Sequence, residues 1–391
     1  MQQSRHDEAE QAGRTAIETL EPLGDSADLA DALHRLGWFF WRRGREAEAD
    51  PLLRRAIDIA ARVDAKLVHA EATQTLAVCQ LSFGTFAEAR RLMEEAFILA
   101  KEAGETTNLL RAYNNIAAIR GASPGPGQAA DVLREGLELA LRGGNIQNGG
   151  WISGSLGELM LILGRLEEAE QLQRQAVDLA RRAADEPLTG QRLGALAQAV
   201  LFRGRVEEAL ELRNESVPIL TANPEPQVAH FLPLIDGYFA LARHDRVAAA
   251  EKFVEAATFA RAHSLDPYPE VFNECVRALV LAGDTARAAT FRDLDASTDS
   301  IQSAAHARNV AGLLEPDPAR AVELLREAVA EFDRLEMRFY AARAMVDLGR
   351  VMTHVSEDPA GLLERARFIL TECDAQLFLF EVDEVLAALK R

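Results

Sequence analysis

The side chains best able to do chemistry in this chain are its histidines, cysteines and paired acids, and their spacing matches no familiar motif. The eight histidines are dispersed, without an HExxH pattern or a cysteine at metal-ligand spacing. Cys79, Cys275 and Cys373 are odd in number and far apart, so they form neither a CxxC pair nor a disulfide framework. Acidic pairs such as Glu94-Glu95 fit solvated helix faces, where a carboxyl lacks the burial that catalysis requires. We therefore expect no catalytic residues, no metal and no cofactor, and we interpret the chain as non-enzymatic.

The glycine-rich and acidic loop segments of the sequence also lack catalytic and metal-binding motifs. The sequence has no GxxxxGK[ST] phosphate loop, and its glycine-rich segments 121–128 and 142–150 are interpreted as turns between helices. Segment 293–300, "DLDASTDS", alternates acids as a calcium loop does, but it lacks the glycine and the terminal glutamate of that motif. Segment 149–158 contains "GSLG" and not the GxSxG of a nucleophile elbow.

Composition narrows the class of partner. The formal net charge of −18 disfavours direct binding to nucleic acid or to anionic membranes. The N-terminal residues contain no apolar run typical of a signal peptide, and no window reaches the length of a membrane-spanning helix. Together with the cysteine usage, this predicts a cytoplasmic protein in a reducing environment.

Four consecutive aromatic residues, Trp38-Phe39-Phe40-Trp41, are unusual in a chain that is only 6% aromatic. Four adjacent residues span most of a helical turn, so they cannot share one face. We expect Phe39 and Phe40 to pack between helices and the two tryptophans to share the other side. A membrane anchor would need a longer apolar face than this, because "RRGRE" follows directly.

A repeat of 40 residues organises the whole chain. Small residues recur at this step five times in succession, and the series then continues with steps of 41, 38, 33 and 40. A glycine precedes many of these residues by five positions, and a pair formed by a large aliphatic and a small residue lies about twelve positions ahead. This pattern predicts pairs of amphipathic helices that join at the glycine and stack into a solenoid. The recurring residues are Ala9, Ala49, Ala89, Ala129, Ala169, Ala209, Ala250, Ala288, Ala321 and Gly361.

The pattern resembles the tetratricopeptide repeat (TPR), from about residue 5 to residue 370. It is similar to the variety with repeats of about 40 residues, found in kinesin light chains and in the C-terminal arms of bacterial STAND-type ATPases and LuxR-type regulators. The resemblance implies an all-α fold, a right-handed α-solenoid of tandem helix pairs. We expect half a repeat at 1–24, five regular repeats at 25–222, two less regular repeats at 223–298, two further repeats at 299–374, and a capping helix at 375–391.

Several positions depart from the family pattern. The second helix carries a polar residue where a large apolar one is usual at Gln173, Arg213, Arg292 and Arg365. Pro233 predicts a kink in a first helix, segment 221–227 predicts a longer loop, and the short step near 293–300 predicts an irregularity.

In the TPR family, certain positions of each first helix line a concave groove, and the resemblance carries these positions over to this chain. All three tryptophans fall among them, although packing between repeats is the alternative explanation for Trp38 and Trp41. The pair Asn114-Asn115 in "YNNIA" resembles kinesin light-chain repeats in which amides hold the main chain of a bound peptide; a solvated polar face is the alternative. The groove residues implied in this way are His34, Trp38, Trp41, Arg42, Gln74, Arg111, Asn114, Asn115, Trp151, Glu158 and Gln198.

Two functional hypotheses remain. The first is a protein- or peptide-interaction module that serves as the partner-sensing arm of a larger bacterial signalling or transcription regulator, binding an extended segment in the groove. The second is a free-standing scaffold that assembles other proteins. The half-repeat at the start of the sequence favours the first and leaves an apolar side, with Ala9, Ile17 and Leu20, that invites self-association.

Overall fold

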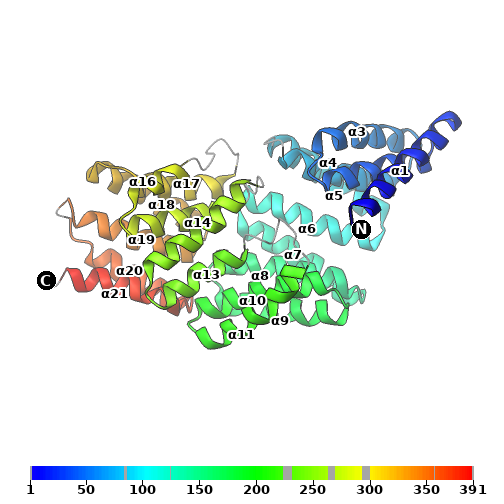
Figure 1. Cartoon of the computed structure of the whole chain (residues 1–391). Helices are drawn as coiled ribbons and strands as arrows, with labels where there is room; N and C mark the ends of the chain where they lie inside the picture. The colour runs from blue at the N-terminus through cyan, green and yellow to red at the C-terminus, as the bar shows by residue number, and fades with distance from the viewer. Residues whose placement is uncertain are drawn as a thin grey trace. The chain divides into compact units, whose positions relative to one another are not determined.

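The computed structural model describes residues 2–82, 86–123, 125–222, 231–262, 269–292, 300–355 and 357–389. Within these ranges the chain is an all-α solenoid with twenty α-helices and no strand, as the repeat predicted (Figure 1). The chain divides into two compact units, residues 1–119 and 120–391, and the boundary falls within helix α6. None of the described helices combines the length and apolar character needed to cross a membrane.

Unit 1 consists of one leading helix followed by stacked helix pairs. Helix α2 pairs with α3, and α4 pairs with α5, while α3 also packs against α4. The elements are α1 (Gln2–Leu20), the 3-10 turn η1 (Glu21–Leu23), α2 (Ala27–Trp41), α3 (Glu46–Arg62), α4 (Lys66–Ser82), α5 (Phe86–Ala103) and most of α6 (Thr106–Ala122).

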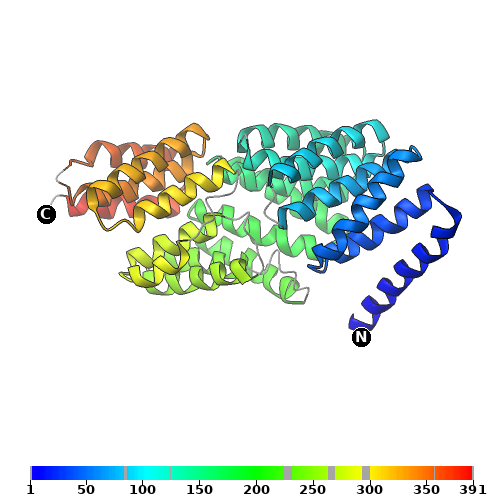
Figure 2. The same cartoon turned by 90° about the horizontal axis from the view of Figure 1, so that it is seen from above.

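Unit 2 continues the same antiparallel pairing, which both cartoon views show (Figures 1 and 2). Its first elements are α7 (Pro126–Arg142), α8 (Ile146–Ile162), α9 (Leu166–Arg182), α10 (Glu186–Phe202), α11 (Val206–Ala222), α13 (Phe231–Ala242) and α14 (Arg246–Ala262). It continues with α15 (Pro269–Leu281), α16 (Thr285–Ala288), η2 (Ala289–Phe291), α17 (Ile301–Leu313), α18 (Pro318–Arg334), α19 (Arg338–Met352), α20 (Ala360–Glu372), η3 (Gln376–Phe378) and α21 (Leu379–Ala388).

The pair α8–α9 shows why the sequence folds in this way. The Asn145 side chain accepts a hydrogen bond from the backbone N–H of Asn148 and caps the start of α8. The turn between the helices contains Gly164 with φ +76°, a conformation that glycine adopts without strain. Gln173, a polar residue where the repeat usually has an apolar one, donates from Nε2 to the carbonyl of Gly154 at 2.9 Å. One end of this buried amide is therefore satisfied by the facing helix, while its Oε1 makes no hydrogen bond within the described chain.

Helix α1 packs against α2, and residues 5–23 are helical as expected. A Cβ at Gly13 would lie 3.0 Å from Cδ1 of Leu36, so the two helices approach closely at this point. Ile17 is buried, Leu20 is half-buried and Ala9 is exposed. The expected apolar side is therefore covered in part by α2, and self-association through it stays a prediction.

The end of unit 2 contacts much earlier helices of the same unit. Phe378 of η3 makes edge-to-face contacts with Phe202 of α10 and Phe339 of α19, at centroid distances of 4.9 Å in both cases. Tyr238 of α13 lies against Phe202 at 4.7 Å. The segment predicted to be a simple capping helix is thus a 3-10 turn and a helix, and it also joins the last repeats of unit 2 to α10.

Three expected irregularities remain largely untested. Pro233 lies in the first turn of the described part of α13, where a missing N–H is tolerated, and the residues just before Phe231 are outside the described ranges. Most of the loop expected at 221–227 and of the irregular segment 293–300 also lies outside the described residues. The repeat boundaries expected from the sequence also stay predictions.

Candidate functional site

A ladder of polar side chains crosses the first helices of three consecutive repeats in unit 1. We call it the inner ladder, and its residues come from α2, α4 and α6. All of them except Asn108 have a counterpart in the ladder 40 residues away, at the equivalent place in a neighbouring repeat. The inner ladder comprises Asp31, His34, Glu71, Gln74, Thr75, Asn108, Arg111, Asn114 and Asn115.

Hydrogen bonds connect ladder residues of α2 to α4 and of α4 to α6. Nε2 of His34 lies 3.2 Å from Oγ1 of Thr75. Nδ2 of Asn115 donates to Oε1 of Gln74 at 3.3 Å, one repeat further along. Nε2 of Gln74 donates in turn to Oδ1 of Asn108 at 3.2 Å. These bonds join buried and half-buried polar side chains across three helices, and the buried polar atoms among them require partners.

Several atoms of the inner ladder have no partner. The buried atoms Nδ2 of Asn108, Nε and Nη2 of Arg111 and Oδ1 of Asn114 make no hydrogen bond within the described chain. These three residues follow one another at steps of three along α6, so they lie on one side of the helix. Both donors and an acceptor are thus left open, and each costs free energy in the unliganded protein.

Burial also shifts the ionisation of the ladder. It lowers the pKa of His34 to about 4, with the positive charge of Arg111 adding to the effect, so the imidazole is neutral near pH 7. Burial likewise raises the pKa of Glu71 and lowers the pKa of Arg111. The ladder therefore combines neutral, charged and unsatisfied groups in a half-buried setting, which is typical of a binding site more than of a solvated face.

The aromatic stretch at the end of α2 is divided only in part as predicted, because Phe39 is half-buried like Trp41 rather than buried like Phe40. Phe40 is buried, and the guanidinium of Arg45 lies 4.2 Å from the centre of its ring. Trp38 is 44% exposed, and Arg42 lies over its ring at 5.9 Å. Trp41 is half-buried. The two tryptophans are thus partly accessible, and whether a partner binds them stays a prediction.

Two of the three predicted groove residues of unit 2 contact a residue that the sequence did not single out. Arg192 of α10 is almost fully buried; it donates from Nη1 to Oε1 of Glu158 at 2.7 Å and lies 5.4 Å from the ring centre of Trp151. Trp151 is 36% exposed, whereas Gln198 is half-buried. Arg192 therefore joins Trp151 and Glu158 into one surface element.

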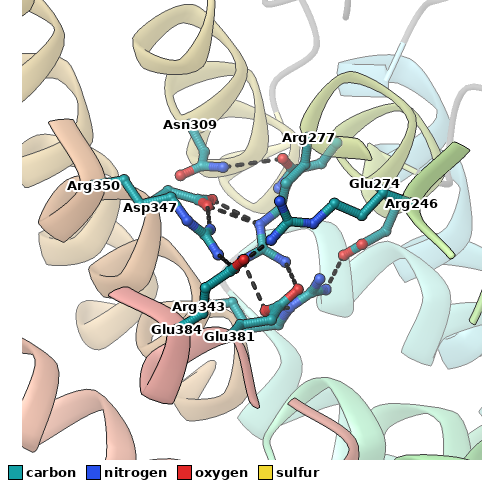
Figure 3. A network of polar contacts seen from close by, with 10 residues as sticks. Arg246, Glu274, Arg277, Asn309, Arg343, Asp347, Arg350, Glu381 and Glu384 are labelled. Atoms are coloured by element: carbon teal, nitrogen blue, oxygen red, sulfur yellow. Dashed lines mark hydrogen bonds and ion pairs between the residues drawn. The ribbon is translucent and has the colours of Figure 1, made fainter. Parts of the chain in front are cut away.

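Unit 2 also contains a buried ionic network that does not involve any predicted site residue (Figure 3). Arg277 of α15 donates to Asp347 of α19 at 2.9 and 3.0 Å and to both oxygens of Glu381 of α21 at 2.9 Å. Arg343 pairs with Glu274 in the same cluster. Burial opposes the charge of Glu381, but Arg277, Arg343 and Arg350 together lower its pKa to about 2. This network fastens α21 to α15 and α19. We assign it a structural role because its carboxylates pair with guanidinium groups of the same cluster, although Nε and Nη2 of Arg343 and Nη2 of Arg350 make no hydrogen bond among the described residues.

Sequence reasoning missed part of the inner ladder for an identifiable reason. Asp31 and Glu71 occupy the same repeat position as Arg111, so the 40-residue register alone could have found them. Thr75 occupies the same repeat position as Asn115 and could have been found in the same way, whereas Asn108 lies at a position outside the expected groove. The network around Arg277 had no signal, because its partners are 70 and 104 residues away and belong to different repeats.

Comparisons with known proteins agree with this architecture. The family model for the tetratricopeptide repeat matches residues 1–62 and 150–222. The chain is a TPR-type repeat protein. No curated protein sequence matches it significantly.

Solved structures share the fold of this TPR-type chain at low sequence identity. A Rap protein complexed with Competence and Sporulation Factor aligns with a TM-score of 0.64 and 12% identity, covering 93% of this chain and 99% of that chain. The Rap conjugation gene regulator of plasmid pLS20, in complex with the Phr* peptide, gives 0.51 and 14%, with 74% and 77% covered. Aspartyl phosphate phosphatase F from Bacillus subtilis gives 0.50 and 11%, with 88% and 94% covered. The repeat fold places the chain in the broad class of protein-interaction modules.

Proposed function

We propose that the chain binds an extended peptide or protein segment along the inner ladder of unit 1. The observation that carries this proposal is the set of open hydrogen-bonding atoms on α6: donors on Asn108 and Arg111 and an acceptor on Asn114. A peptide main chain offers an acceptor and a donor at almost every residue, so it can satisfy such a set of atoms whatever its sequence. The partly accessible Trp38 and Trp41 would add side-chain contacts at the α2 end of the same unit.

The finer assignment is a partner-sensing arm of a bacterial regulator. It is supported by the resemblance of the repeats to regulator arms and by the fold shared with the Rap regulator that was solved with a peptide. A free-standing scaffold remains the second candidate, since TPR-type folds serve both roles. The sensing arm and the scaffold differ in the effect of peptide binding. In a sensing arm, peptide binding would change the behaviour of attached or associated regulatory domains, whereas in a scaffold it would not.

Peptide selection with the whole chain tests the binding proposal. Peptides selected from a random displayed library on the wild-type chain are measured by fluorescence anisotropy against Asn114→Ala and, as a control, Asn214→Ala. Asn214 is exposed on the second helix α11, so its loss should leave the dissociation constant unchanged. We expect Asn114→Ala, which removes the open acceptor, to weaken binding at least tenfold, about 1.4 kcal/mol. Equal affinity for the two variants, or a library that gives no binder, would rule out the ladder as a peptide site.

A further inference from the structure

At the α2 end of the inner ladder, one nitrogen and two carboxylates converge. Ligand atoms of Asp31, His34 and Glu71 all lie within 4.8 Å of one another. Asp31 and His34 are three residues apart on α2 and so share one side of that helix, while Glu71 comes from the neighbouring first helix α4. The group therefore bridges two repeats.

The hydrogen bonding of His34 determines which nitrogen faces the carboxylates. Oγ1 of Thr75 donates its proton to the carbonyl of Glu71 at 2.9 Å, so toward Nε2 of His34 it can act only as an acceptor. We assign the proton of the neutral imidazole to Nε2 for this reason. The Nδ1 atom then presents a bare lone pair.

No donor among the described residues reaches that lone pair, and carboxylate oxygens of Asp31 and Glu71 lie close to the ring. Nδ1 of His34 is buried without a hydrogen-bond partner, and it lies 3.9 Å from Oε2 of Glu71. His34 itself is 6% exposed. Three acceptors that face one another across a few ångströms are stabilised by a cation placed between them, and a ring nitrogen whose other N–H is held by hydrogen bonding is the usual arrangement of a metal-ligating histidine.

We propose that Asp31, His34 and Glu71 bind a divalent transition-metal ion of the zinc class. Imidazole nitrogen with carboxylate oxygen suits Zn²⁺ and its neighbours, whereas Mg²⁺ and Ca²⁺ prefer oxygen alone. Bonds of roughly 2.1 Å in a tetrahedral site place ligand atoms about 3.4 Å apart, so small side-chain rotations close the site. A fourth position stays open for water or another donor.

Neighbouring charges leave room for this ion. Arg35 donates to Oδ2 of Asp31 at 2.7 Å, which leaves Oδ1 for the metal. Arg111 acts on both His34 and Glu71 by its charge, but the carboxylate of Glu105 acts on Glu71 from the same region. The carboxylates of Asp31, Glu71 and Glu105 therefore outnumber the guanidinium groups of Arg35 and Arg111. An ion at this site would fasten α2 to α4 and does not depend on peptide binding.

Titration of the untagged full chain with Zn²⁺ and with Co²⁺ tests the site. After treatment with a chelator, calorimetry with Zn²⁺ should give one site per chain, and Co²⁺ should produce the visible absorption of a four-coordinate ion. Glu71→Gln and Asp31→Asn keep the side-chain shapes and should each weaken binding at least tenfold. His354→Gln controls for metal binding at a histidine outside the proposed site, because His354 is exposed in unit 2.

Circular dichroism of each metal-free variant establishes that it is folded. The proposal fails if folded Glu71→Gln and Asp31→Asn bind Zn²⁺ as tightly as the wild type. It also fails if the wild type shows no site, or if His354→Gln removes binding, since each result would place the metal elsewhere or nowhere. Peptide binding is measured separately, in the presence of chelator. A failure of the metal proposal would therefore leave the proposed peptide binding standing. A failure of peptide binding would likewise leave the metal proposal standing.

Discussion

At the level of single residues, close helix pairing depends on small side chains at positions where the facing helix leaves no space for a larger one. Ala169 and Ala176 are fully buried on α9, on either side of Gln173, whose amide contacts α8. We predict that Ala169→Glu lowers the free energy of unfolding by several kcal/mol, roughly 3 or more, because it buries an unpaired carboxylate. Urea denaturation followed by circular dichroism measures the change. Ala330→Glu is the control, because Ala330 is an exposed residue of α18. A similar loss of stability in both variants would contradict the assigned helix register.

Trp41 and Phe40 are adjacent residues with opposite expected roles. Phe40 is buried, so Phe40→Ala should lower the free energy of unfolding by about 3 kcal/mol. Trp41 is half-buried, and Trp41→Ala should weaken peptide binding by roughly thirtyfold, about 2 kcal/mol, while leaving stability nearly unchanged. Thermal melting and anisotropy on both variants separate the roles. A sharp fall in melting temperature for Trp41→Ala with unaltered binding would make it a packing residue.

At the level of helices, α21 is held to unit 2 by charge as well as by apolar contact. Glu381 accepts from Arg277 in a fully buried setting, whereas Glu384 is half exposed and pairs with Arg246 and Arg350 (Figure 3). Glu381→Ala should cost roughly 3 to 5 kcal/mol, since it leaves buried guanidinium groups without their partner. Glu384→Ala should cost less than about 1 kcal/mol. Denaturation of the full chain compares them, and equal costs would show that the network is solvated.

Helix pairing was readable from the sequence, but the contacts between distant helices were not. The turn glycines Gly44, Gly164, Gly204 and Gly283 all have positive φ, because local backbone geometry is encoded by local residues. The contact of Phe378 with Phe202 instead depends on the small rotation that each repeat adds to the one before it. No residue pair in the sequence encodes that sum, so the closure of unit 2 on its own earlier helices could not be predicted.

The inner ladder could be predicted from the sequence only in part. Its positions, except that of Asn108, follow from the 40-residue register. The asparagine pair was predicted from this register together with the groove positions that the TPR resemblance implies. The register does not say which polar atoms are satisfied, because that depends on side-chain rotamers across three helices. The open atoms of Asn108 and Arg111, and the lone pair of His34, therefore appear only in the structure.

At the level of the whole molecule, stability should depend on pH through buried neutral histidines. His306 of α17 is fully buried between Phe332 and Tyr340, with Nδ1 2.9 Å from Nδ2 of Asn273. Burial, aided by the charge of Arg343, lowers its pKa from 6.5 to about 3. The unfolded chain therefore binds a proton between these values while the folded chain does not. Stability from this group is complete above pH 6.5 and is lost as pH falls toward 3.

We predict that His306→Gln, which keeps a hydrogen-bonding side chain and removes the titration, loses less stability than the wild type between pH 6.5 and 4.5. The difference should approach about 1 kcal/mol per pH unit. Glu270 acts in the opposite direction over this window, because burial raises its pKa from 4.5 to about 7. Glu381 loses its charge only below pH 4.5, since its own pKa is about 2. Both groups are present in the wild type and in the variant, so the difference between their denaturation midpoints at each pH isolates His306. Parallel pH profiles for the two proteins would mean that His306 is protonated in the folded state and that its site is open to water.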